Sequence, residues 1–309
     1  MAAKGGSRVT QNRTLQAGLA ILGYAILIAF TDNFVRYISD TTGLWQFHAT
    51  RAVMIAPLIL LMSWWMSERV RPRNPRAVLA RSLVHGLAML IYFGCLAFLS
   101  VAQTAAGLFT APIFVLLFSR FLFGHKLGPV RILAVALGSL GVVLVLQPGS
   151  ASPLGWLSLV PVLAGALYAL GNLATREWCE GESATTLLAG FFMTLGIAGA
   201  VGLVLLALFP VAVPEGPDGF ILRGWVTPTP GFLAVCLLQA VGSILGIRMM
   251  IRGYQLADAS RVAVFEYMVL PASLIWSFLL WGERVDMLAL GGMVLITVAG
   301  AIIAFRSRQ

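Results

Sequence analysis

Long apolar runs follow one another along almost the whole chain, and short polar stretches separate them. The runs are too long for strands and lack strict alternation, so they predict helices, which satisfy their own backbone hydrogen bonds in lipid. A helix needs about 20 residues to cross a hydrocarbon core about 30 Å thick. The pattern predicts ten transmembrane helices, over residues 15–38, 44–66, 81–101, 104–124, 129–147, 154–175, 185–209, 231–251, 260–281 and 287–305.

The composition supports the same class, an all-α polytopic membrane protein. Apolar residues make up 59% of the 309 residues and charged residues only 11%, whereas a soluble domain carries about 25% charged residues. A secretory signal peptide is the competing interpretation of the N-terminus. The run from Leu15 to Phe30 is longer than a typical signal core of about 7–15 residues, and no A-x-A site follows it. We therefore expect a retained first span.

The basic residues predict the orientation of the spans. With the N-terminus in the cytoplasm, 17 of the 21 Lys and Arg residues fall in cytoplasmic segments and 3 outside, while Arg51 lies within a span. Such an excess is typical of cytoplasmic loops. We expect both termini in the cytoplasm. The net charge of +9 then reflects topology, and no nucleic-acid partner is expected.

The ten spans divide into two sets of five, so a repeated unit would be inverted in its second copy, as in many secondary transporters. The expected units are residues 1–148 and 149–309. Similar segments stand at corresponding places: FLSVAQTAA at 98–106 and YQLADASRV at 254–262. Asn33 and Asn172 occupy similar places in the first span of each half, and Pro112 and Pro271 in the fourth.

Several short motifs in this order resemble the drug/metabolite transporter superfamily, specifically its EamA-type ten-helix carriers. They are TDNFV at 31–35, Arg51, AQTAA at 102–106, FTAP at 109–112, ADAS at 257–260, FEY at 265–267 and WGE at 281–283. One departure is His125, where the first repeat usually has a glutamate. The resemblance implies a bacterial solute carrier or exporter with a central cavity, in a family that moves amino acids, nucleotide derivatives, S-adenosylmethionine and other metabolites.

Two ionisable residues lie at matching depth in the first two spans. A charge near the membrane centre costs about 2.5–3.5 kcal/mol on insertion scales, so it is expected to face a cavity or a partner. Asp32 and Arg51 each lie about seven residues from the outer surface, roughly 10 Å deep. We predict that they pair, or share a cavity with Asn33 and His48. The alternative is a salt bridge that only fastens the two spans.

Glu266 and Tyr267 form a second candidate cluster, in the ninth span. A pair between Glu266 and Arg248 or Arg252 is one possibility. An unpaired carboxyl could instead take up a proton and couple transport to a proton gradient; facilitation or exchange without protons is the alternative.

Aromatic and amide side chains make the third group of candidate substrate-binding residues. A planar solute could stack on the aromatic rings, and amides could orient it; contact with lipid at the membrane interface is the alternative. The group comprises Tyr92, Tyr168, Asn172, Gln239 and Trp276.

Sequence signatures of other classes are missing. The chain has no GxxxxGK[ST], HExxH or GxSxG motif, its three histidines are scattered, and its three cysteines include no CxxC pair. We expect no enzyme activity, cofactor or metal. The sequence predicts an inner-membrane secondary transporter, monomeric or homodimeric, for a small polar or zwitterionic metabolite such as an amino acid or its derivative. A channel and a membrane enzyme acting on a lipid-linked substrate are the alternatives.

Overall fold

The protein is helical throughout the part that the structure describes. The computed structural model describes residues 3–95, 99, 104, 107–146, 159–282 and 287–306, and all regular elements in these ranges are helices. The elements are α1 (Ala3–Asp32), α2 (Arg36–Ser39), α3 (Leu44–Trp65), α4 (Pro75–Cys95), α6 (Ala111–Phe121), α7 (Pro129–Leu146), α8 (Val160–Glu177), α9 (Ala184–Leu208), η2 (Gly216–Gly219), α10 (Pro230–Leu256), α11 (Ala259–Val262), η3 (Ala263–Met268), α12 (Val269–Trp281) and α13 (Met287–Arg306).

Each predicted span contains a helix. Six helical segments within the described ranges are long and apolar enough to cross a membrane, and α6, α7 and α13 contain shorter apolar segments. Three parts of the prediction fall outside the described residues: the AQTAA motif except Thr104, the boundary at 148/149 and Glu283.

The third span begins earlier than predicted. We expected a loop over 67–80, but α4 begins at Pro75. Proline suits the first helical position because its missing N–H would have no partner there. Asn74 caps this end, since its Oδ1 accepts the N–H of Ala77 at 3.2 Å. Arg81, which the prediction placed at the membrane surface, therefore lies within the helix.

The first and ninth spans are interrupted, although the sequence predicts continuous helices. In the first, α1 ends at Asp32 and α2 begins at Arg36. In the ninth, the chain passes from α11 through the 3-10 segment η3 into α12. Pro271 explains the second break, because its ring would clash with the carbonyl of Tyr267 in a continuous α-helix.

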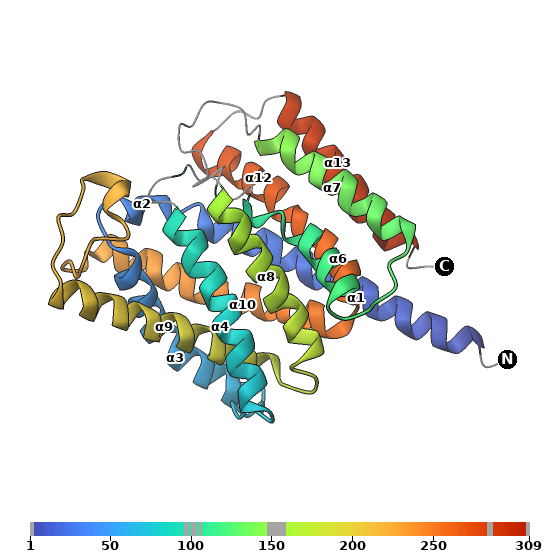
Figure 1. Cartoon of the computed structure of the whole chain (residues 1–309), viewed down its shortest axis with the longest axis horizontal. Helices are drawn as coiled ribbons and strands as arrows, with labels where there is room; N and C mark the ends of the chain where they lie inside the picture. Colours follow the sequence, from blue (N-terminus) through green and yellow to red (C-terminus); the bar gives the residue numbers. More distant parts are fainter. Residues whose placement is uncertain are drawn as a thin grey trace.

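The helices pack in pairs that are distant in sequence (Figure 1). α3 packs against α9, α1 against α10, α4 against α8, and α7 against α13. The α7–α13 pair lies along one edge of the bundle. The first turn of α1 and the last turn of α13 lie at the same end of the molecule.

A small residue sets the close approach of α3 and α9. A Cβ added at Gly199 would lie 2.6 Å from the backbone oxygen of Trp45 and 2.7 Å from the nitrogen of Ala49. Backbone atoms of a packed helix cannot give way as the end of a flexible side chain can. Only glycine therefore permits this crossing, as is common where membrane helices touch.

Gly199→Ala is expected to lower the free energy of unfolding by about 1–3 kcal/mol, because the added methyl group forces the two helices apart. The measurement is the melting temperature of the purified protein in detergent. Gly291→Ala on α13 is the matched control, since nothing lies within 4 Å of its added Cβ. Equal melting temperatures for the two variants would contradict this account of the crossing.

Candidate functional site

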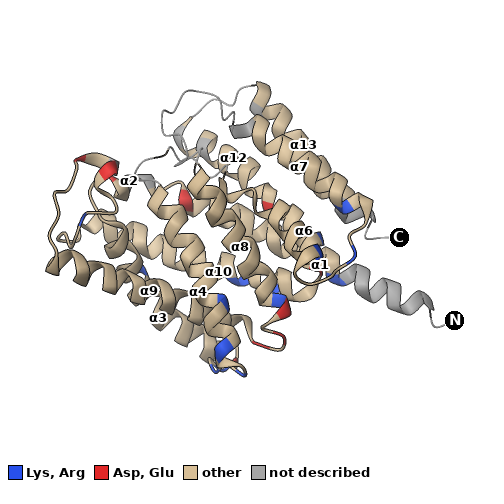
Figure 2. Ribbon diagram, in the orientation of Figure 1, with Lys and Arg blue, Asp and Glu red and all other residues tan. Residues whose placement is uncertain are grey.

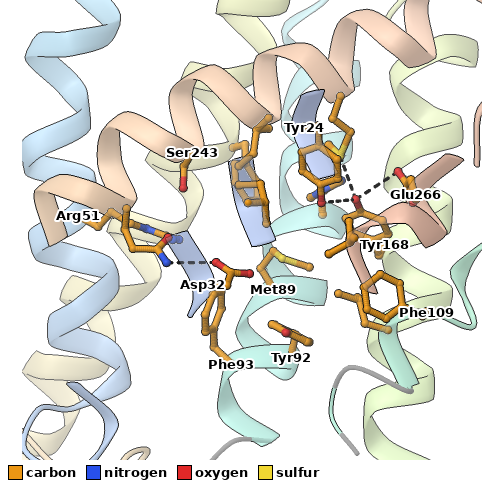
Figure 3. A pocket seen from close by; sticks show the side chains of 18 residues that line it. Tyr24, Asp32, Arg51, Met89, Tyr92, Phe93, Phe109, Tyr168, Ser243 and Glu266 are labelled. Atoms are coloured by element: carbon orange, nitrogen blue, oxygen red, sulfur yellow. Dashed lines mark hydrogen bonds between the residues drawn. The ribbon is translucent and has the colours of Figure 1, made fainter. Parts of the chain in front are cut away.

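A cavity of about 80 Å³ lies in the middle of the bundle (Figure 3). Residues from α1, α3, α4, α8, α9, α10, η3 and α12 line it, together with Leu108 and Phe109 before α6. Both halves of the chain therefore contribute. The space holds only a few water-sized groups, so a larger solute requires side chains or helices to move.

One polar end of the cavity is formed by Asp32, Gln239 and Arg51. The Nε2 of Gln239 donates to Asp32 Oδ1 at 3.1 Å and to the carbonyl of Thr31 at 2.9 Å. Asp32 is therefore held at the last residue of α1, where the first span is interrupted. Figure 3 shows Asp32 and Arg51 at the same side of the cavity.

Arg51 is surrounded mainly by aromatic rings. Its guanidinium lies 4.7, 5.4 and 5.7 Å from three ring centroids, within the range of cation–π contacts; these belong to Phe47, Phe192 and Phe93. Its Nη2 lies 3.3 Å from Nδ1 of His48. Among the described residues, no carboxylate lies within 4.0 Å of this guanidinium. Asp32 and Arg51 both line the cavity, whereas Asn33 and His48, which we predicted to share it with them, do not. Among the described residues, neither the predicted direct pair nor the fastening salt bridge of the alternative is present.

Tyr24, Tyr168 and Glu266 form the other polar end (Figure 3). Tyr168 donates to Glu266 Oε1 at 3.3 Å, and its hydroxyl lies 3.1 Å from that of Tyr24. Asn172 donates to the same carboxylate oxygen at 3.1 Å. Since η3 carries Glu266 and α8 carries both Tyr168 and Asn172, this network joins the broken ninth span to the sixth.

The suggested pair between Glu266 and Arg248 or Arg252 is wrong. Both arginines bind Glu68 instead, at 2.7 and 3.0 Å. They lie on α10 beyond the end of the cavity, where the loop after α3 reaches them.

Aromatic and sulfur-containing side chains cover the wall between the two polar ends. Met89, Tyr92 and Phe93 come from α4, and Phe109 comes from the segment before α6 (Figure 3). Tyr92 is one of the predicted site residues that the structure places in this wall. Such a surface suits the apolar body of a solute, with the polar ends left to orient it.

The other predicted site residues do not line the cavity. His48 lies behind Arg51, and the amide of Asn33 donates to the carbonyl of Ala29 at 2.7 Å. Tyr267 points to α7, where its hydroxyl lies 2.9 Å from that of Ser139. Trp276 packs on Phe30, with ring centroids 4.8 Å apart, in a groove between α1, α10 and α12.

Sequence reasoning missed four polar residues at or near the cavity. Tyr24, His85 and Ser243 line it, and Arg81 lies one turn before His85. A signal was available on α4, because Arg81, His85 and Tyr92 recur at helical spacing and share a face. Within the described residues, no group of three or more His, Cys, Asp and Glu side chains could hold a metal ion.

A second, larger pocket of about 770 Å³, here called the vestibule, opens where α8 ends, α10 ends and the loop after α3 passes. Ionisable residues dominate its lining: Arg13, Glu68, His125, Arg176, Glu177, Glu180, Glu182, Arg252 and Asp258. At its rim, Asp258 accepts a hydrogen bond from Arg131 at 3.1 Å and lies within 3.7 Å of Arg176.

Glu68 is the centre of the ionic cluster in the vestibule. Its carboxylate binds Arg248, Arg252 and the hydroxyl of Thr185. The hydrogen bonds from Arg248 lower the pKa of this carboxyl to about 2, and those from Thr185 and the charge of Arg252 act in the same direction. The cluster joins the α3–α4 loop, α9 and α10.

Comparison with known proteins bears directly on the family. The EamA-like transporter family matches residues 15–147. A riboflavin transporter of Rhizobium johnstonii is 28% identical over 69% of this chain and 65% of its own length. A pseudopaline exporter of Pseudomonas aeruginosa is 25% identical over 89% of this chain and 92% of its own.

A solved crystal structure superposes with a TM-score of 0.72 over 94% of this chain and 97% of the other, at 17% identity, which shows a shared fold. The first half of the chain is therefore an EamA-like transporter domain, and the chain as a whole is a multi-span membrane protein related to transporters of the drug/metabolite transporter superfamily.

Proposed function

We propose that this protein is a secondary transporter that carries a small polar solute, such as an amino acid or its derivative, through the central cavity by alternating access. The observation that carries the proposal is the cavity itself. Its two polar ends contain two carboxylates and a guanidinium deep within the bundle, and both halves of the chain line it. Ionisable groups at such depth mark solute pathways in membrane proteins.

The pairing of helices supports two inverted five-helix repeats. When spans one to five are matched with spans six to ten, α1 corresponds to α8, α3 to α9, α4 to α10, α6 to α12 and α7 to α13. The contact of α1 with α10 then corresponds to that of α8 with α4, and the contact of α6 with α8 to that of α12 with α1. The pairs α3–α9 and α7–α13 map onto themselves, as a pseudo-twofold axis requires.

The charge distribution supports an inner-membrane topology with both termini in the cytoplasm. Most of the Lys and Arg residues coloured in Figure 2 lie at the end of the bundle where α4 begins, and α1 begins and α13 ends on that side (Figure 1). Positive residues are enriched on the cytoplasmic side. In this orientation the vestibule is the cytoplasmic entrance and the α9–α10 loop with η2 is outside.

Counterflow in proteoliposomes tests the proposal. Vesicles preloaded with single candidate solutes, namely amino acids, S-adenosylmethionine, nucleosides, riboflavin or quaternary amines, are expected to accelerate uptake of the same labelled solute. A carrier exchanges solute for solute, whereas a channel gives no such stimulation. Asp32→Asn is expected to reduce the exchange about 10-fold or more, because a charged hydrogen-bond acceptor in the cavity is lost. Folded protein that shows no counterflow with any solute contradicts the proposal.

A further inference from the structure

Arg81 is a buried charge next to the central cavity. Its side chain is 0% exposed, and it precedes His85 by one turn on the face of α4 that also carries Met89 and Tyr92. These three residues line the cavity. Arg81 therefore lies beside the cavity, one turn closer to the beginning of α4.

Only two of the three guanidinium nitrogens of Arg81 form hydrogen bonds with the described residues. Nε donates to Oγ1 of Thr175 at 3.0 Å and Nη1 to the carbonyl of Leu187 at 3.3 Å, both uncharged acceptors. Nη2 is fully buried and has no hydrogen-bond partner among the described residues. Throughout the part of the chain that is described, no carboxylate lies within 4.0 Å of Arg81. Buried charges are ordinarily paired, because an isolated ion loses its hydration without compensation.

Two acidic groups on this side of the bundle, Glu68 and Glu182, are engaged elsewhere. Glu182 Oε1 accepts the backbone N–H groups of Arg73 and Asn74, each at 2.7 Å. Glu68 binds Arg248 and Arg252. Burial raises the pKa of the neighbouring Cys179 thiol to about 11, so it is not an anion at neutral pH.

Arg81 has neighbours that line each of the two pockets, the vestibule and the central cavity. Its partner Thr175 and its neighbour Cys179 line the vestibule. On the other side, His85 and Tyr168, both within electrostatic reach of Arg81, line the central cavity. Arg81 itself is fully buried, between residues that line the vestibule and residues that line the central cavity.

We propose that Arg81 binds the anionic group, a carboxylate or phosphate, of an organic solute on the path between the vestibule and the central cavity. A guanidinium with a free N–H suits such oxygens, since it donates charge-assisted hydrogen bonds in a fixed fork. The inference rests on the proposed transport function and narrows its substrate class to solutes that carry an anionic group. Arg51, at the far polar end of the central cavity, is a second guanidinium that has no carboxylate within 4.0 Å among the described residues.

Melting temperature separates this role from a structural one. If Arg81 only ties α4 to α8 and α9, Arg81→Met removes two hydrogen bonds and lowers the melting temperature. If Arg81 is held for a ligand, the variant melts at the same or a higher temperature, because an apolar side chain of similar size replaces an uncompensated ion. Arg76→Met, at an exposed position of the same helix, is the matched control. A melting temperature clearly below that of the control overturns the proposal.

Ligand-induced stabilisation tests the binding itself, in protein held in lipid nanodiscs. The probes are phenylacetate, phenylphosphonate and inorganic phosphate, with uncharged phenylacetamide as the matched control. We expect a saturable rise in melting temperature with at least one anion and none with the amide. In Arg81→Met the apparent affinity for that anion falls about 10- to 100-fold, whereas Arg81→Lys retains part of it. The response to phenylacetate against phenylphosphonate distinguishes a carboxylate from a phosphate.

Two results overturn the inference: no rise with any anion in the wild type, or the same rise in Arg81→Met. Counterflow keeps this failure distinct from failure of the transport function. Wild-type vesicles that exchange only uncharged or cationic solutes refute the anion site and leave the transporter in place. An anion response that depends on Arg81, in protein without any counterflow, supports the site and refutes the transporter.

Discussion

Counterflow through a Glu266→Gln variant is expected to be about 10-fold slower than through the wild type, or slower still. Glu266 lies on η3 at one polar end of the cavity, and its carboxyl group receives hydrogen bonds from Tyr168 and Asn172 on α8. An amide replaces one accepting oxygen by a donating NH₂ group, which opposes the donors that face it. The measurement is the initial rate of labelled uptake into preloaded proteoliposomes.

Glu215→Gln in the exposed α9–α10 loop is the control for the same chemical change. Both variants are expected to be monodisperse and folded, because the glutamine keeps the shape of the side chain. Equal counterflow rates and half-saturating concentrations for the two variants would show that Glu266 has no part in solute binding. Accumulation driven by a proton gradient, measured in the same vesicles, decides whether proton movement accompanies transport.

Glu68→Gln is expected to lower the free energy of unfolding by about 1–3 kcal/mol at pH 7, because it leaves two arginines facing each other without their carboxylate. The pKa of this group is about 2 in the folded protein against an ordinary value of 4.5. Its stabilisation is therefore complete above about pH 4.5 and is lost as the pH falls toward 2. The measurement is the melting temperature of wild type and variant as a function of pH.

The difference in melting temperature between the wild type and Glu68→Gln should shrink steadily below pH 4.5. Glu180→Gln, at an exposed position that also lines the vestibule, is the control and should follow the wild type throughout. A constant difference between wild type and Glu68→Gln from pH 7 to pH 3 would mean that the ionic cluster does not stabilise the fold.

The sequence predicts the helical class and the depth of the polar residues well, since both depend on local quantities. Apolar runs give the helices, and a fixed rise per residue places Asp32 and Arg51 at matching depth. Both indeed line one cavity. The partners of these groups depend on which helices pack together, and periodicity carries no such information. Gln239, which binds Asp32, is 207 positions away in the chain.

Two neighbouring residues show most clearly that the sequence pattern does not determine which way a side chain faces. Glu266 and Tyr267 belong to one predicted cluster, but the first faces the cavity and the second faces α7. The direction of each side chain depends on the angular phase of the helix, and the 3-10 segment shifts that phase. Arg81 was not predicted as a site residue for a different reason. Its charge was assigned to the membrane surface because the start of α4 was predicted six residues too late.

A change of helix type in the interrupted ninth span would couple rotation of the helix to movement along its axis. A 3-10 helix rises about 2.0 Å and turns about 120° per residue, against 1.5 Å and 100° in an α-helix. Rewinding the six residues of η3 into an α-helix would shorten the span by about 3 Å and turn one end against the other by about 120°. Glu266 would then swing away from Tyr168 and Asn172 while α12 is drawn along its axis. Release of the carboxylate and displacement of a whole helix would thus be a single rotation.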